Sequence, residues 1–143
     1  MTAITLEYFK VVEKYQEVTL KGGETVSSRA GKYMRVDATT GKAVLGNATS
    51  ATEVGTIRGL AETDQAYLGD SVTLLQHGLC DFGDALDGMD YGALIYLSDV
   101  DGTLADAAGT VTTAIVGYVQ PKFEADGTAK KLAYINMITV IGA

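Results

Sequence analysis

Residues Leu94–Leu104 read Leu-Ile-Tyr-Leu-Ser-Asp-Val-Asp-Gly-Thr-Leu, an apolar strand followed by a turn of acidic residues and glycine. Asp99 and Gly102 occupy the first and fourth positions of that turn. Aspartate bonds to the backbone of its own turn and glycine tolerates a positive φ, as a type I turn followed by a left-handed residue requires. The stretch therefore predicts a β-hairpin in which Asp99 forms the turn.

The same stretch also resembles the nucleophile motif of haloacid dehalogenase-type phosphatases, in which Asp99 would attack and Asp101 would act as its acid–base partner. That fold needs a long alternation of strands and helices after the motif, whereas 37 residues without an amphipathic helix follow Asp106. A calcium loop counted from Asp99 would place Leu104 where glycine is needed and Thr110 where glutamate is needed. We therefore expect no enzyme, no catalytic residue, no cofactor and no metal site.

The composition of the whole chain favours strands. A length of 143 residues suits one domain with a single core. Seventeen glycines and one proline, with many Val, Thr, Tyr and Ala residues, favour short strands joined by tight turns. We predict an all-β fold, a small single-domain β-barrel or β-tulip-like body over residues 16–143, with an N-terminal arm over residues 1–15.

Apolar runs bounded by turn residues mark the expected strands, at residues 17–20, 32–36, 43–45, 54–61, 71–75, 79–82, 93–97, 110–119 and 131–141. Glycine-containing turns are expected between them, at residues 21–24, 37–41, 68–70, 87–88 and 126–127. Gly55, Gly59 and Gly117 fall inside strand patterns and predict bulges that curl the sheet. Pro121 is expected just after a strand, where its missing N–H does no harm.

The first fifteen residues have no single period. Ile4, Leu6 and Tyr8 alternate as in a strand, whereas Tyr8, Val12 and Tyr15 could share one helix face. An arm that takes its structure on a partner explains this mixture, and a first strand or helix of the core is equally compatible with it. The residues predicted to bind a partner are Ile4, Leu6, Tyr8, Phe9, Val11, Val12 and Tyr15.

Charge and cysteine content limit the possible partners. A net charge of -7 and a pI near 4.5 argue against nucleic acid, because a binder must offset phosphate charge with a basic face. The single cysteine, Cys80, cannot form an internal disulfide and suits a reducing cytoplasm. Glu7, Lys10 and Glu13 interrupt any signal-peptide core, and no apolar run is as long as a membrane span. We expect synthesis in the cytoplasm and no contact with a membrane.

Three further groups of residues carry side chains that occur in catalytic or binding sites. His77 and Cys80 should point to opposite faces of a strand, so they neither share a metal nor form a nucleophile–base pair. An acidic cluster is interpreted as a solvated loop, with a cation site as the alternative: Asp81, Asp84, Asp87 and Asp90. Four tyrosines are interpreted as half-buried sheet residues, with a glycan-binding platform as the alternative: Tyr91, Tyr96, Tyr118 and Tyr134.

A shift of the sequence by 62 residues aligns Asp37 with Asp99 and Val54-Gly55 with Val116-Gly117. The matches are few, so an internal duplication is a weak hypothesis. They do give Asp99 a counterpart in a stretch without any phosphatase motif, which favours its interpretation as a turn residue.

The run from Asp81 to Val119 resembles small capsid cement proteins of tailed bacteriophages. The resemblance lies in the order and spacing of short motifs, namely Gly83-Asp84-Ala85-Leu86-Asp87-Gly88, Tyr91-Gly92, Ile95-Tyr96-Leu97-Ser98-Asp99, Asp101-Gly102-Thr103-Leu104-Ala105-Asp106 and Val116-Gly117-Tyr118-Val119. Val54-Gly55 and Gly69-Asp70-Ser71-Val72 add to it, so that it covers roughly residues 31–140. The first 30 residues are unlike the short N-termini usual in such proteins.

This resemblance implies a structural decoration protein of the virion that joins the outside of an assembled phage head. It would act as a homotrimer, clamp neighbouring major capsid protein subunits and perform no catalysis. An acidic body fits that location, because it would be repelled from the DNA-filled interior. The arm would add a strand to an exposed capsid edge. The alternatives are a phage tail or fibre module that binds host glycan and the phosphatase described above.

Overall fold

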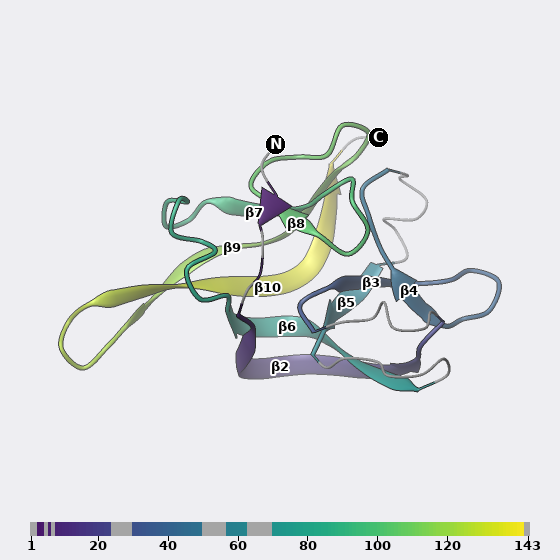
Figure 1. Ribbon diagram of the computed structural model, residues 1–143, viewed down its shortest axis with the longest axis horizontal. Helices are drawn as coiled ribbons and strands as arrows, with labels where there is room; N and C mark the ends of the chain where they lie inside the picture. The colour runs from purple at the N-terminus through teal and green to yellow at the C-terminus, as the bar shows by residue number, and fades with distance from the viewer. Residues whose placement is uncertain are drawn as a thin grey trace.

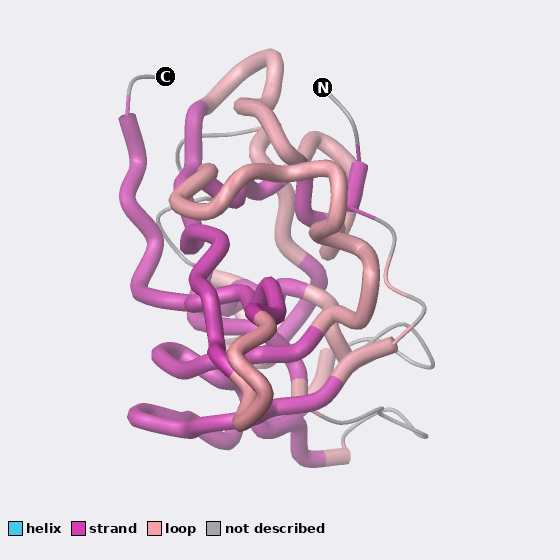
Figure 2. Tube along the Cα trace, turned by 90° about the vertical axis from the view of Figure 1, so that its left-hand side faces the viewer, coloured by secondary structure: helices cyan, strands magenta, loops and turns pink. Residues whose placement is uncertain are grey.

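The computed structural model describes residues 3–4, 6, 8–23, 30–49, 57–62 and 70–141. These residues form strands, turns and loops and no helix, which confirms the predicted all-β class (Figure 2). The strands are β1 (Ala3–Ile4), β2 (Lys10–Lys21), β3 (Tyr33–Val36), β4 (Ala43–Leu45), β5 (Ile57–Ala61), β6 (Ser71–Asp81), β7 (Leu94–Leu97), β8 (Leu104–Ala105), β9 (Thr113–Phe123) and β10 (Ala129–Ile141). No helix in the described ranges is long and apolar enough to cross a membrane.

All strands belong to one antiparallel sheet that divides at β6. Its order is β1-β8-β7-β9-β10-β6-β5-β3-β4, and β2 pairs with β6 outside this path. One edge of β6 pairs with β2 along its whole length, while the other edge is shared by β10, at residues 78–80, and β5, at residues 74–75. The sheet therefore curls into a half-barrel, and the barrel-like fold is confirmed (Figure 1).

Two of the three predicted glycine bulges are present. The pairing of β7 with β9 shifts register beside Gly117, and the pairing of β3 with β5 shifts beside Gly59. A Cβ on Gly59 would lie 2.7 Å from the Leu75 carbonyl oxygen, and one on Gly117 would collide with the Tyr134 carbonyl oxygen. β5 can therefore approach β6, and β9 can approach β10, only because Gly59 and Gly117 lack a side chain. Gly55 lies outside the described residues.

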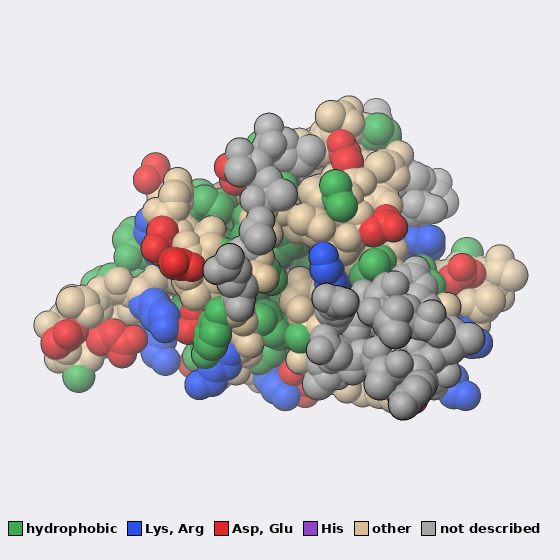
Figure 3. Space-filling view, in the orientation of Figure 1, with side chains coloured by type: hydrophobic (Ala, Val, Ile, Leu, Met, Phe, Trp, Pro, Cys, Tyr) green, Lys and Arg blue, Asp and Glu red, His purple; other side chains and the backbone are tan. Residues whose placement is uncertain are grey.

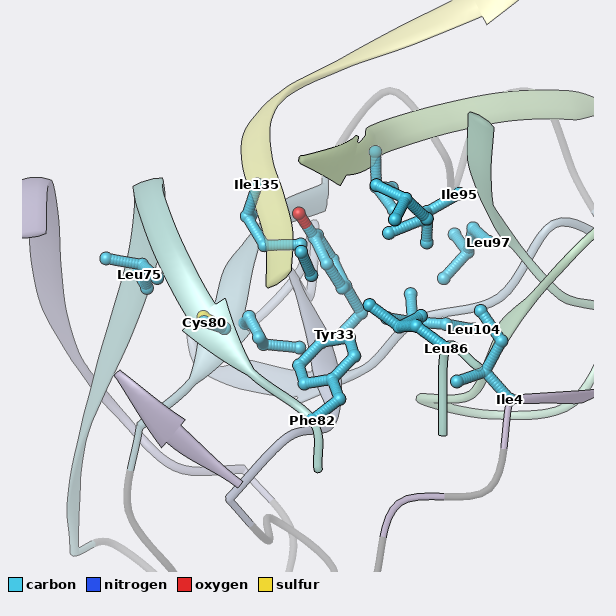
Figure 4. Close-up of a cluster of buried hydrophobic side chains, with 14 of the residues drawn as sticks. Ile4, Tyr33, Leu75, Cys80, Phe82, Leu86, Ile95, Leu97, Leu104 and Ile135 are labelled. Atoms are coloured by element: carbon cyan, nitrogen blue, oxygen red, sulfur yellow. The ribbon is translucent and has the colours of Figure 1, made fainter. Parts of the chain in front are cut away.

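The core has two parts. The larger cluster draws side chains from β1, β3, β5 and β6 and from β7 to β10, and several of its members are shown in Figure 4: Ile4, Tyr33, Leu75, Cys80, Phe82, Leu86, Ile95, Leu97, Leu104 and Ile135. The smaller cluster lies among β3, β4, β5 and the first half of β6: Met34, Ala43, Ala61, Val72 and Leu74. Buried aliphatic and aromatic side chains therefore pack on both parts of the curled sheet.

Several strand predictions need correction. A single strand, β6, replaces the two predicted at residues 71–75 and 79–82, because His77 and Gly78 continue the ladder with β2 past a register shift at Gln76. β9 starts at Thr113 and continues to Phe123, so Pro121 lies within a strand and not after it. Its position is still harmless, since the pairing of β9 toward β7 ends near Val119 and leaves that edge open.

The N-terminal segment is part of the sheet. β1 pairs with β8, through Ala3↔Ala105 and Ile4↔Leu104. β8 is the second strand of the hairpin predicted at residues 94–104, and a first strand was one of the alternatives left open for residues 1–15. β2 begins at Lys10, so the predicted boundary between residues 15 and 16 falls inside a strand that is bonded to β6. Local patterns left the bounds of β1 and β8 and their pairing open, because two residues are too few to show alternation.

Candidate functional site

The turn between β7 and β8 is the hairpin that the sequence predicts. Leu97 pairs with Leu104, and Gly102 has a φ of +70°. The Ser98 N–H donates to the Thr103 carbonyl at 2.9 Å, and the Val100 N–H donates to Ser98 Oγ at 3.0 Å. The expectation that Asp99 bonds to its own turn is wrong, because the Ser98 hydroxyl takes that place.

Asp99 instead fastens a second loop. Its Oδ2 accepts hydrogen bonds from Thr110 Oγ1 at 2.7 Å and from the Thr110 N–H at 3.1 Å. The same N–H lies 3.2 Å from Oδ1. Both carboxylate oxygens therefore face a structural donor and hold the segment before β9 against the β7–β8 turn.

The rest of the turn is clasped by neighbouring backbone. The Gly102 N–H donates to the Gly46 carbonyl at 2.6 Å, and the Tyr33 N–H donates to the Gly102 carbonyl at 3.0 Å. Asp101 Oδ1 accepts from Asn47 Nδ2 at 2.5 Å. The two acids of the phosphatase-like motif thus each engage a loop of this chain, Asp99 the one before β9 and Asp101 the one after β4.

The predicted acidic cluster does not act as a unit. Asp81 is buried, its Oδ2 lies 2.7 Å from Lys130 Nζ, and its Oδ1 accepts from the Gly83 N–H at 2.8 Å. Burial opposes ionisation of Asp81, but Lys130 and the Gly83 N–H outweigh it and lower the pKa of this carboxyl. The other three acids are exposed in a loop, as predicted: Asp84, Asp87 and Asp90. Within the described ranges, no three His, Cys, Asp or Glu side chains are placed to hold a metal ion.

Four rings form a row across neighbouring strands, which we call the aromatic row: Tyr15 of β2, His77 of β6, Tyr134 of β10 and Tyr118 of β9. Successive ring centroids lie 5.0, 5.2 and 5.0 Å apart. His77 Nε2 and the Tyr134 hydroxyl share a short hydrogen bond. Tyr15 is 56 % exposed and Tyr118 is 38 % exposed, so the row ends at the surface on both sides.

The burial of His77, Cys80 and the four tyrosines agrees in part with the sequence-based predictions. His77 belongs to the row, whereas Cys80 is fully buried in the core and burial raises the pKa of its thiol to about 12. These two side chains therefore point to opposite faces, as predicted. Tyr134 and Tyr96 are half-buried, as predicted, while Tyr118 and Tyr91 are exposed.

The rings are arranged to contact one another rather than a flat ligand. Tyr118 and Tyr134 stack with an interplanar angle of 24°, so each covers a face of the other. The Lys131 ammonium lies 5.3 Å from the Tyr91 ring centroid. Stacked sugar rings need open aromatic faces, and this arrangement offers few of them.

The residues predicted to bind a partner are divided between core and surface. Ile4 is 6 % exposed and belongs to the larger core cluster, against which Leu6, Phe9 and Val11 also pack. Val12 is half-buried. Tyr8 is 50 % exposed, and Tyr15 lies in the aromatic row. Of the seven, these two rings are the ones open to a partner in this conformation.

One polar cluster was not anticipated from the sequence. Lys14 Nζ lies 3.0 Å from Glu62 Oε1 and 3.4 Å from Glu17 Oε2. Burial raises the pKa of Glu62, and the hydrogen bond from Glu62 lowers that of Glu17. The cluster joins β2 to the end of β5 across 45 residues of sequence, a distance at which local patterns carry no signal.

Searches of family models, curated proteins and solved structures find no match to this chain.

Proposed function

We propose that this chain is a structural capsid cement protein. It binds the outside of an assembled phage head as a homotrimer, clamps neighbouring major capsid protein subunits and catalyses no reaction. The motif order over roughly residues 31–140 suggests this role. The observation that favours it over the phosphatase alternative is the bonding of Asp99, since both of its carboxylate oxygens face Thr110.

A rigid body with a fixed footprint suits such a role. The loops around the β7–β8 turn are bonded to one another, and the aromatic row crosses four strands. Many copies on a symmetric shell make weak contacts effective through multivalency. The acidic net charge of -7 favours the outer surface over the DNA-filled interior.

The exposed rings of the N-terminal segment are the proposed capsid contacts. Tyr8 and Tyr15 combine a large apolar face with a hydroxyl, and such rings often dominate interface energetics. Deleting residues 2–15 would not test them, because it also removes Ile4 from the core and the first six residues of β2. Substitution of the two exposed rings leaves both elements in place.

The experiment mixes purified protein with expanded and with immature capsid shells and measures co-sedimentation. We expect binding to expanded shells, and a Tyr8→Ser/Tyr15→Ser variant should bind roughly 10- to 100-fold more weakly. Val111→Ser, which changes a 52 % exposed apolar residue on another loop, is the matched control. Absence of binding by the unaltered chain to any shell would remove the proposal, and equal binding by the double variant would remove these two contacts.

A phage tail or fibre module that binds host glycan is the second candidate. The exposure of Tyr91 and Tyr118, 47 % and 38 %, favours it. The stacking of Tyr118 on Tyr134 and the Lys131 ammonium beside Tyr91 weigh against it. A glycan array with strong, selective signals that Tyr91→Ser abolishes would favour this candidate over the cement protein.

A further inference from the structure

The β9–β10 hairpin ends in a projecting tip, residues 121–130, all of which are exposed. Figure 1 shows the hairpin extending away from the rest of the sheet, and Figure 3 shows acidic and lysine side chains gathered on it. At about 3.3 Å per residue, the strand part of each arm of the tip is roughly 7–10 Å long, and the turn extends beyond it. The tip is therefore placed to touch another molecule.

The tip is held in one conformation. The Glu124 N–H donates to the Thr128 carbonyl at 2.8 Å, and the Gly127 N–H donates to the Glu124 carbonyl at 3.0 Å. Asp126 Oδ1 accepts from the Thr128 N–H at 3.0 Å and from Thr128 Oγ1 at 2.7 Å. A partner would not have to order this turn, which lowers the entropic cost of binding.

Phe123 is the most exposed apolar side chain of the tip. It is 70 % exposed, the largest exposed fraction among the large hydrophobic residues of the described ranges. Its neighbour Glu124 is also exposed and makes no ion pair with any described residue. An exposed aromatic ring beside a carboxylate is complementary to an apolar pocket with a cation at its rim.

The chain contains such a pocket on its body. Its volume is about 350 Å³, and its apolar lining includes Ile4, Leu6 and Leu104. Lys32 is the cation in its wall, and no carboxylate of the described residues pairs with the Lys32 ammonium. Gly102 and the stem of Lys32 lie close together, because a Cβ on Gly102 would come within 3.0 Å of Lys32 Cδ.

We infer that the hairpin tip of one copy docks in this pocket of a second copy. Phe123 enters the space beside Ile4, Leu6 and Leu104, and the Glu124 carboxylate pairs with the Lys32 ammonium. The two surfaces differ, so the contact is head-to-tail and repeats until a ring closes. The inference deepens the proposed homotrimer by giving it a contact, and it does not require that the protein bind a capsid.

The contact fits the rest of the molecule. The tip extends away from the rest of the sheet, so a second chain can reach it (Figure 1). Tip and pocket bring together a carboxylate and an ammonium that make no ion pair among the described residues of their own chain. Their attraction offsets part of the repulsion between two chains that each carry a net charge of -7.

Charge reversal with rescue provides the test. Analytical ultracentrifugation of the full chain should show a closed oligomer, and Phe123→Ser should weaken association by roughly 10- to 100-fold. Lys32→Glu and Glu124→Lys should each weaken it about 10-fold or more, and the two combined should restore association to within a few-fold of the unaltered chain. Val111→Ser is the control for loss of an exposed apolar group, and thermal unfolding of each variant checks the fold.

Two results would overturn the inference: a monomeric unaltered chain, or single reversals that weaken association without rescue in the double variant. Glu124 lies on an exposed turn, so Glu124→Lys tests the contact even if Lys32→Glu unfolds. An oligomer with this behaviour that binds no capsid shell would contradict the proposed function and leave the contact standing. A monomer that binds shells would do the reverse.

Discussion

The two acidic turns at residues 37–41 and 98–103 look alike in sequence and differ in what they hold. Each starts near an aspartate and contains a glycine with almost the same φ, +71° at Gly41 and +70° at Gly102. Asp37 Oδ1 accepts from the N–H groups of Thr39 and Thr40, at 2.8 and 3.0 Å, inside its own turn. Asp99 accepts from Thr110, eleven residues away. Similar local chemistry closes one turn and ties another to a distant loop.

The glycines should give the largest difference between the turns. Alanine at either position pays about 1–2 kcal/mol for a left-handed backbone. At Gly41 nothing lies within 4 Å of the added Cβ, whereas at Gly102 the Leu45 and Lys32 side chains lie 3.0 Å from it. We expect Gly41→Ala to cost about 1 kcal/mol and Gly102→Ala about 2–4 kcal/mol in urea unfolding. Equal losses would mean that the surroundings of Gly102 yield without cost.

Loss of the Asp99 carboxylate should have the next largest effect. Asp99→Ala removes charge-assisted hydrogen bonds to Thr110 and should lower the free energy of unfolding by about 1–3 kcal/mol, and Asp99→Asn by roughly 0.5–1.5 kcal/mol. A double-mutant cycle with Thr110→Ala should show coupling above about 0.5 kcal/mol. Independent effects of the two substitutions would argue that Asp99 does not fasten this loop.

The stability that the Asp37 carboxylate contributes to its turn should depend on pH in the acidic range. The backbone N–H groups of Thr40 and then Thr39 hold the pKa of this carboxyl below its usual 3.8. A lowered folded pKa adds stability that is complete above the unfolded value and is lost as the pH falls through the folded one. The difference in melting temperature between the unaltered chain and Asp37→Asn should therefore be constant at neutral pH and shrink below about pH 4. A difference that persists unchanged at pH 2 would contradict this account.

The smallest expected effect is on phosphoester hydrolysis. We expect no magnesium-dependent hydrolysis of a generic phosphoester by the unaltered chain, and therefore no activity for Asp99→Asn to remove. The measurement is release of inorganic phosphate by both proteins under identical conditions. A phosphorylated intermediate trapped on Asp99 would overturn both the interpretation of this turn and the cement proposal.

Local chemistry predicted much of the fold. The strand at residues 43–45 has the predicted bounds, and the turn at Asp126-Gly127 closes a hairpin, since both follow from alternation and turn residues alone. The bulges at Gly59 and Gly117 could be expected because a glycine inside a strand pattern has few other uses. The pairing of β1 with β8 was not predicted, since these two-residue strands lie about 100 residues apart in the sequence.

The candidate sites were harder to predict, because their members come from distant parts of the chain. Three register shifts between β2 and β6 set Tyr15 beside His77. A different number of bulged residues in β2 or β6 would move Tyr15 along the ladder or to the other face of the sheet. The same dependence hides the joining of Lys14 with Glu62.

The sequence by itself determined the strand class, the turns at residues 37–41 and 126–127 and the acidic net charge, because backbone preferences and net charge are local or additive. Tertiary structure alone decided that Ile4 is buried, that Asp99 bonds to Thr110 and that four rings align across β2, β6, β10 and β9. Each of these depends on strand register and sheet curvature. A shift of one residue in register turns a side chain from the core to the solvent, and no local pattern specifies it.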